Sequence, residues 1–174
     1  MHSHNHHLMK VPEHFRGFFK FSEFNELQST CYNDIVMSDK NVVITAPTGS
    51  GKTVLFELAL LRLLKMQSGK CIYLAPSRAL ISERTNDWNK RGFINSSADI
   101  FIYTPERLEI ETRKELSKYE ECRLLLVDEI HTVGQRERGP KLEILITRLR
   151  CHNPRLRIVA VSATISNHED LCKW

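Results

Sequence analysis

Short apolar runs alternate with longer amphipathic stretches along most of the chain. The apolar runs predict strands at 41–45, 71–75, 99–103, 123–127 and 156–161. The spacing of apolar residues between them predicts helices at 24–37, 52–66, 78–89 and 139–150, one after Pro105, and a short one after Thr164. This alternation predicts an α/β domain with a doubly wound, mainly parallel sheet, in which ligands lie beyond the carboxyl ends of the strands.

The two parts of the chain differ in composition. Residues 1–10 carry four histidines among small polar residues, which predicts a disordered tail rather than a metal site. Residues 11–174 hold every predicted element, and this length supports one well-buried core. No apolar run approaches the roughly 18 residues of a membrane helix, so we expect no membrane partner. Five cysteines without a Cys-x-x-Cys pair favour an intracellular protein without a disulfide framework.

The net charge of +4 allows a nucleic-acid partner without requiring one. Basic residues are concentrated between Arg136 and Arg157, where seven Lys and Arg side chains stand against two glutamates. Two interpretations of this segment are open. It is either a solvated helix and loop or a surface that contacts phosphates.

A glycine-rich stretch, "APTGSGKT", leaves the first predicted strand and enters the next predicted helix. Backbone N–H groups at such a helix start attract phosphate, and glycine allows close approach. Lys52 is expected to reach the β- and γ-phosphates of ATP, and Thr53 to place its hydroxyl on Mg²⁺. The predicted ATP-binding residues are Ala46, Pro47, Thr48, Gly49, Ser50, Gly51, Lys52 and Thr53, with Ala46 standing where the usual pattern has glycine.

An acidic pair follows the apolar run at 123–127. Asp128 is expected to bind Mg²⁺, and Glu129 to act as general base on the attacking water. Taken alone, such acids are often only favourable charges at a helix start. Together with Lys52 they are the predicted catalytic residues, and we expect the nucleotide to lie where the first and fourth predicted strands end side by side.

The order of these motifs resembles that of the superfamily 2 helicases. The stretches "APTGSGKT", "APSRAL" (75–80), "TPE" (104–106), "DEIH" (128–131) and "SAT" (162–164) are similar to motifs I, Ia, Ic, II and III. "RGPKLE" (138–143) is similar to the Ski-type DExH branch, and within it the segment 24–29 and "FELA" look most like the meiotic crossover DNA helicases. The resemblance covers 11–174 and implies the N-terminal, RecA-like P-loop NTPase domain of an ATP-dependent helicase.

The resemblance also implies roles for further residues. Gln28 would read the adenine edge, although a glutamine on a helix is otherwise an ordinary surface residue. His131 would join a relay that couples the nucleotide site to strand movement, and a structural histidine is the alternative. The other relay residues are Ser162, Ala163 and Thr164, and those expected along the nucleic-acid backbone are Pro76, Ser77, Arg78, Thr104, Pro105 and Arg107.

The same resemblance predicts the partners. It favours DNA over RNA as substrate and implies a nuclear protein that acts in meiosis.

Only 23 residues separate Leu80 from Thr104, where the family normally fits a further strand and a DNA contact. The family also needs a second RecA-like domain whose arginine completes the ATP site. We therefore expect this chain to bind ATP but to hydrolyse it slowly alone. The alternatives are a nucleotide-gated nucleic-acid-binding module without unwinding activity and a fragment of an RNA helicase.

Overall fold

A computed structural model describes residues 11–66, 69–94 and 99–163 of the chain. The predicted tail at 1–10 and the predicted helix after Thr164 lie outside these residues. Within them the strands are β1 (Val42–Thr45), β2 (Lys70–Leu74), β3 (Ile100–Tyr103), β4 (Cys122–Val127) and β5 (Arg157–Ser162). The helices are α1 (Glu13–Arg16), α2 (Glu26–Val36), α3 (Thr53–Lys65), α4 (Arg78–Lys90), α5 (Pro105–Lys114) and α6 (Gly139–His152), with 3₁₀ turns η2 (Ser117–Tyr119) and η3 (Ile130–Gly134).

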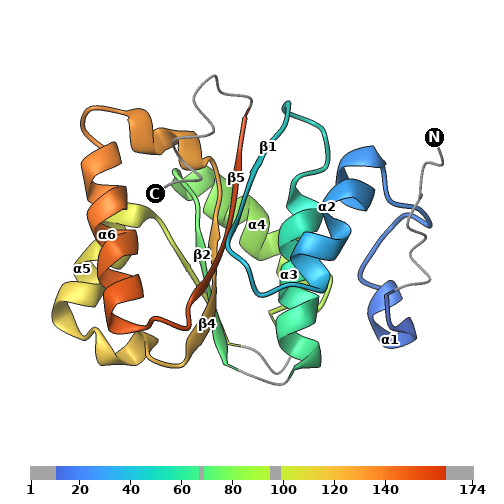
Figure 1. Cartoon of the computed structure of the whole chain (residues 1–174), viewed down its shortest axis with the longest axis horizontal. Coiled ribbons are helices and arrows are strands. Elements are labelled where there is room, and N and C mark those ends of the chain that lie inside the picture. Colours follow the sequence, from blue (N-terminus) through green and yellow to red (C-terminus); the bar gives the residue numbers. More distant parts are fainter. Residues whose placement is uncertain (1–10, 67–68, 95–98, 164–174) are drawn as a thin grey trace.

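The strands form one parallel sheet in the order β1-β5-β4-β2-β3, with helices on both faces (Figure 1). Helices α5 and α6 cover one face, and α2, α3 and α4 cover the other. The predicted doubly wound α/β fold is therefore confirmed. Most element boundaries agree with the predicted ones within two residues, because the spacing of apolar residues is a local signal. Helix α1 was not predicted.

Strand β4 shows why both faces are covered. Its side chains alternate between the two sides of the sheet. Leu124 and Leu126 pack in the core under α2, α3 and α4, whereas Leu125 and Val127 pack in the core under α5 and α6. A strand buried on both sides needs an unbroken apolar run, and that is the pattern at 123–127.

One prediction about the sheet is wrong. The first and fourth strands do not end side by side, because β5 lies between β1 and β4. Ala160, at the middle of β5, pairs with Val43 on one side and with Val127 on the other. Since all the strands run in parallel, β1 and β4 still end at the same edge of the sheet.

None of the helices among the described residues combines the length and hydropathy of a membrane span.

Candidate nucleotide site

The glycine-rich loop forms a tight turn between β1 and α3. Gly49 and Gly51 both take left-handed backbone angles, with φ of 82° and 81°, which glycine adopts without strain. A Cβ at Gly51 would come 2.5 Å from Gln28 Nε2, so a side chain at this position would displace the Gln28 amide. Lys52 Nζ donates to the carbonyls of Ala46 and Pro47 at 2.6 and 2.7 Å. The lysine ammonium thus lies over the start of the loop, at the carboxyl end of β1.

Side chains at the start of α2 hydrogen-bond to this loop. Asn25 caps α2 by accepting from the N–H of Gln28 at 2.9 Å, and its Nδ2 donates to the carbonyl of Ser50 at 2.9 Å. Gln28 Oε1 accepts from the N–H of Asn25, while its Nε2 donates to the carbonyl of Gly51 at 3.2 Å. The structure therefore brings Gln28 to the nucleotide loop, and its adenine-reading role stays a prediction. Asn25 was missed, although its spacing from Gln28 is that of a capping box.

The first acid of the DEIH stretch is held by a tyrosine from the neighbouring strand. The phenol of Tyr73, on β2, donates to Asp128 Oδ2 at 2.8 Å. Burial raises the pKa of the Asp128 carboxyl above its usual value, and the Tyr73 hydrogen bond opposes this by favouring the carboxylate. Burial likewise raises the pKa of Tyr73, so the phenol keeps its proton and acts as the donor.

A single guanidinium connects the two predicted Mg²⁺ ligands. Arg84, on α4, donates through Nη2 to Thr53 Oγ1 at 3.2 Å, and its positive charge partly opposes the rise that burial causes in the pKa of Asp128. Thr53 begins α3 and Asp128 follows β4, yet Arg84 interacts with both, through a hydrogen bond to Thr53 and through its charge on Asp128. Tyr73 and Arg84 were missed by sequence reasoning, since no local pattern marks them and only the sheet order and the packing of α4 bring them to the site.

The second acid has a strained backbone. Glu129 is the one non-glycine residue at positive φ among the described residues, with φ 55° and ψ 47°. Such a conformation costs on the order of 1–3 kcal/mol and persists only where surrounding structure imposes it. His131 Nδ1 lies 3.0 Å from Glu129 Oε2 and 3.1 Å from Ser162 Oγ, at the end of β5. His131 therefore connects the acidic pair to the start of the predicted relay, where Ala163 is partly buried and Thr164 lies outside the described residues.

The segments predicted along the nucleic-acid backbone lie at the same edge of the sheet, beyond β2 and β3. Ser77 and Thr104 each cap a helix by accepting from a backbone N–H, Ser77 at the start of α4 and Thr104 at the start of α5. Pro105 occupies the first turn of α5, Arg78 and Arg107 are exposed, and Arg107 pairs with Glu111. Arg138 donates to the carbonyl of Pro76 at 3.5 Å, which ties the first segment to the start of α6. Two helix starts beside exposed arginines suit a phosphate backbone.

The basic segment from Arg136 to Arg157 does not form one surface. Arg138 lies at the nucleotide edge of the sheet, whereas Arg150 and Arg155 lie at the opposite edge, near the amino ends of the strands. Arg157 is buried and bonded to backbone carbonyls. Neither of the two interpretations therefore describes the segment as a whole.

Comparison with known proteins places the chain among helicases. The DEAD/DEAH box helicase family matches residues 25–171. The chain is 41% identical to the "ATP-dependent DNA helicase MER3" of Saccharomyces cerevisiae over 94% of its own length and 16% of that protein. It is 37% identical to the "Probable ATP-dependent DNA helicase HFM1" of Homo sapiens, over 96% of the chain and 14% of that protein. It is 35% identical to the "DExH-box ATP-dependent RNA helicase DExH14" of Arabidopsis thaliana, over 92% and 9%.

The chain thus spans a small fraction of these relatives. The match to the yeast protein runs over 190 positions while covering 94% of this 174-residue chain, about 164 residues, so about 26 positions have no counterpart here. The matched region of the yeast protein is therefore longer than this chain, and a shortened segment between Leu80 and Thr104 stays a prediction. The extent of the match, which includes the glycine loop, the DEIH stretch and the residues around them, shows that the chain belongs to the DEAD/DEAH box helicase family.

Proposed function

We propose that this chain is the ATP-binding half of an ATP-dependent DNA helicase, a RecA-like domain that couples ATP binding and hydrolysis to movement along a nucleic-acid strand. One observation carries the proposal: Lys52 and Thr53 from the glycine loop share one edge of the sheet with Asp128 and Glu129. The expected nucleic-acid segments flank this site at the ends of β2 and β3. Nucleotide and strand would therefore bind at adjacent sites.

The donor set of the site fits Mg²⁺. A hydroxyl from Thr53 and a carboxylate from Asp128 are oxygen ligands of the kind that this ion prefers. Both already interact with a cation, since Arg84 donates to Thr53 and its charge favours the ionised form of Asp128. When bound, Mg²⁺ would neutralise charge that develops on the phosphates. Thr53 and Asp128 would hold it, and Tyr73 would orient the Asp128 carboxylate.

The remaining residues have separate roles in the proposed mechanism. Lys52 would exchange its loop carbonyls for phosphate oxygens, since a charged acceptor binds an ammonium more strongly than a neutral carbonyl does. Glu129 would accept the proton of the attacking water, from the orientation that its left-handed backbone imposes. His131 and Ser162 would transmit the state of Glu129 to the end of β5.

Substrate, pathway and location belong to the same proposal. Two of the relatives above carry "DNA helicase" in their names and share 37–41% identity with the chain, which favours DNA. The resemblance of 24–29 to the meiotic crossover type supports a nuclear, meiotic role. The relative named as an RNA helicase, at 35% identity, favours RNA as the second candidate substrate.

The test of the site uses two variants of the purified chain. Lys52→Ala should abolish binding of a fluorescent ATP analogue, because the ammonium that contacts the phosphates is lost. Glu129→Gln should keep binding intact and stop turnover. Lys90→Ala, an exposed lysine at the end of α4, is the matched control and should change neither. Unchanged ATP affinity in the Lys52 variant would refute the proposed site.

A second assay separates the motor from the alternative of a nucleotide-gated binding module. ATP turnover is measured with and without single-stranded DNA or RNA, on this chain and on a longer protein that includes a second RecA-like domain. For a motor half, nucleic acid stimulates turnover of the longer protein, and an arginine from the second domain contributes about 10³–10⁵ in rate. For a binding module, nucleic acid binds in a nucleotide-dependent way without stimulating turnover.

A further inference from the structure

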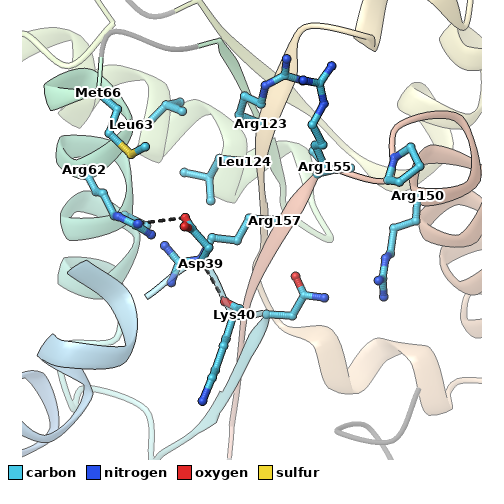
Figure 2. Close-up of a pocket in the computed structure, with 14 residues that line it drawn as sticks. Asp39, Lys40, Arg62, Leu63, Met66, Arg123, Leu124, Arg150, Arg155 and Arg157 are labelled. Carbon is cyan, nitrogen blue, oxygen red and sulfur yellow. Dashed lines mark hydrogen bonds and ion pairs between the residues drawn. The ribbon is translucent and has the colours of Figure 1, made fainter. Parts of the chain in front are cut away.

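A pocket of about 570 Å³ lies at the edge of the sheet opposite the nucleotide site (Figure 2). Its walls come from the loop before β1, from α3, from the start of β4 and from the segment between α6 and β5. We call it the amino-edge pocket. None of the residues assigned above to the nucleotide or the nucleic acid lines it.

The lining of the amino-edge pocket is strongly basic. Asp39 is the one acid among the described residues that line it, and it pairs with Arg62 at 2.8 Å. Arg157 donates to backbone carbonyls. Arg150 and Arg155 are exposed and make no ion pair or hydrogen bond with the part of the chain that the structure describes. Two unpaired guanidinium groups at the mouth of a pocket favour a ligand with carboxylate or phosphate groups.

The floor of the pocket is apolar. Leu63 of α3, Met66 directly after α3 and Leu124 of β4 line it. Figure 2 shows Leu63 and Met66 across the pocket from Arg150 and Arg155, with Leu124 between them. Met66 is 55% exposed, which is high for a large apolar side chain. A second pocket, of about 410 Å³ and mostly apolar residues, shares Arg62 and Met66 with the first. The basic surface therefore continues into an apolar one.

This combination favours a peptide over a nucleic acid. Single-stranded nucleic acid is usually held by aromatic side chains on which bases stack, and no aromatic residue is among those that line the amino-edge pocket. A phosphate backbone also has no aliphatic group to fill the floor. The chain's own residues 1–10 contain neither Asp nor Glu, so they do not complement the arginines.

We propose that the amino-edge pocket binds an acidic segment of a partner protein, with one aliphatic side chain against Leu63, Met66 and Leu124. Carboxylates beside this anchor would pair with Arg150 and Arg155. The partner would bind at the edge of the sheet away from the nucleotide, so it could stay bound while ATP is exchanged.

The test measures the binding of two fluorescent probes by anisotropy at about 50 mM salt. The first is a set of 12-residue peptides rich in Asp and Glu with a single leucine at successive positions, and the second is a single-stranded DNA oligonucleotide. The double variant Arg150→Glu, Arg155→Glu should weaken binding of the best peptide at least about tenfold, because attraction becomes repulsion. The control Lys90→Glu, Lys114→Glu makes the same change in net charge at exposed residues outside the pocket and should leave peptide affinity within about twofold.

The apolar contact is tested by pairing two substitutions. Met66→Ser should weaken peptide binding about fivefold, and a peptide with serine in place of its leucine should bind wild type about as weakly. Combining the two should add little further loss, because they remove the same contact. Circular dichroism and urea unfolding of each variant check that it folds.

Several outcomes would overturn the proposal. One is that no peptide of the set binds wild type at millimolar concentration. Another is that a peptide without leucine binds as tightly as the best one, or that the Lys90, Lys114 control loses as much affinity as the arginine pair. A third is that the arginine variant loses DNA affinity and keeps peptide affinity, which would make the pocket a phosphate site.

Discussion

Tyr73 illustrates how a buried core residue becomes part of a candidate active site. Its ring packs against Phe56 and Trp88 in the core under α3 and α4, and its hydroxyl reaches the carboxylate of Asp128. The aromatic body therefore anchors a donor whose position depends on the packing of the core. At the scale of single residues, the chemistry of the site depends on such neighbours as much as on the motif residues themselves.

Tyr73→Phe should raise the pKa of Asp128 further above its usual value. The Tyr73 hydroxyl stabilises the Asp128 carboxylate, so removing it favours the protonated form. The pKa increase that burial causes is then opposed by fewer interactions. The measurement is an NMR titration of the ¹³C-labelled aspartate carboxyl carbons, in which the Asp128 midpoint moves to higher pH. Tyr103→Phe, on β3, is the control. An unchanged midpoint in the Tyr73 variant would mean that the hydrogen bond does not form in solution.

The cysteines offer a second test at this scale. Cys71 and Cys122 are buried, and burial raises the pKa of the Cys122 thiol to about 12, whereas Cys151 is exposed. Thiolates are the reactive form, so iodoacetamide at about pH 8 should modify Cys151 rapidly and leave the two buried thiols intact until urea unfolds the protein. Peptide mapping by mass spectrometry gives the rates. Equal native rates at Cys122 and Cys151 would contradict the packing described here.

At the scale of elements, a buried ion pair joins α3 to the end of α4. Glu57 is 1% exposed, and its two carboxylate oxygens accept from Arg91 at 2.5 and 2.8 Å. Trp88 Nε1 also donates to Glu57, at 3.4 Å, and Arg91 continues to the carbonyl of Phe18. The pair therefore holds three parts of the chain together beneath the nucleotide loop.

Arg91→Ala should destabilise the protein by about 3–5 kcal/mol, because it leaves Glu57 buried without its partner. Burial already raises the pKa of Glu57, and losing Arg91 raises it further. At pH values between the pKa of Glu57 in the unfolded chain and its higher pKa in the folded variant, the folded protein holds a proton that the unfolded chain has released. The stability of the variant therefore falls as the pH rises through this interval. The deficit in urea unfolding should accordingly be larger at about pH 8 than at about pH 5.

Two variants serve as controls for this prediction. Asp87→Asn removes a partly exposed partner of Arg91 and should cost less than about 1 kcal/mol. Replacing both Glu57 and Arg91 with leucine should recover much of the loss, because no charge is left buried. A double variant as unstable as Arg91→Ala would indicate that the pair contributes through packing rather than charge.

In the molecule as a whole, Arg157 joins the last strand to a segment more than 100 positions earlier in the chain. Its guanidinium, on β5, donates to the carbonyls of Asp34, Ile35 and Lys40 at 2.7, 2.8 and 3.0 Å. These bonds connect the end of α2 and the loop after it to the fifth strand, and they satisfy carbonyls that would otherwise lack a partner at the helix end. Arg157 is therefore a structural residue, although it stands in the basic segment.

Arg157→Lys should lower the free energy of unfolding by about 2–4 kcal/mol. A lysine keeps the charge but cannot reproduce the planar fork, so at least one buried carbonyl loses its donor. Arg155→Lys, two residues away and exposed, should change stability by less than about 0.5 kcal/mol. Urea unfolding of both variants makes the comparison, and equal stability would show that the three bonds are replaceable.

Local patterns in the sequence were sufficient to predict the five strands, helices α2 to α6 and the motifs in the loops between them. Apolar period, caps and glycines are local signals, so they suffice to place the loop at 46–53 and the acids at 128–129 at the ends of strands. The sequence also predicted that this loop and these acids lie at the same edge of the sheet, because the carboxyl ends of parallel strands meet at one edge. Gln28 came from the resemblance to a family and not from its pattern.

The order of the strands in the sheet, and the residues that surround the site, could be known only from the folded chain. The insertion of β5 between β1 and β4, the reach of Tyr73 and Arg84 to Asp128 and Thr53, and the left-handed backbone of Glu129 depend on contacts between segments far apart in the chain. The same holds for the division of the basic segment into a buried Arg157 and an exposed pair at the amino-edge pocket. Such contacts form when helices pack on both faces of the sheet, and no short stretch of sequence specifies them.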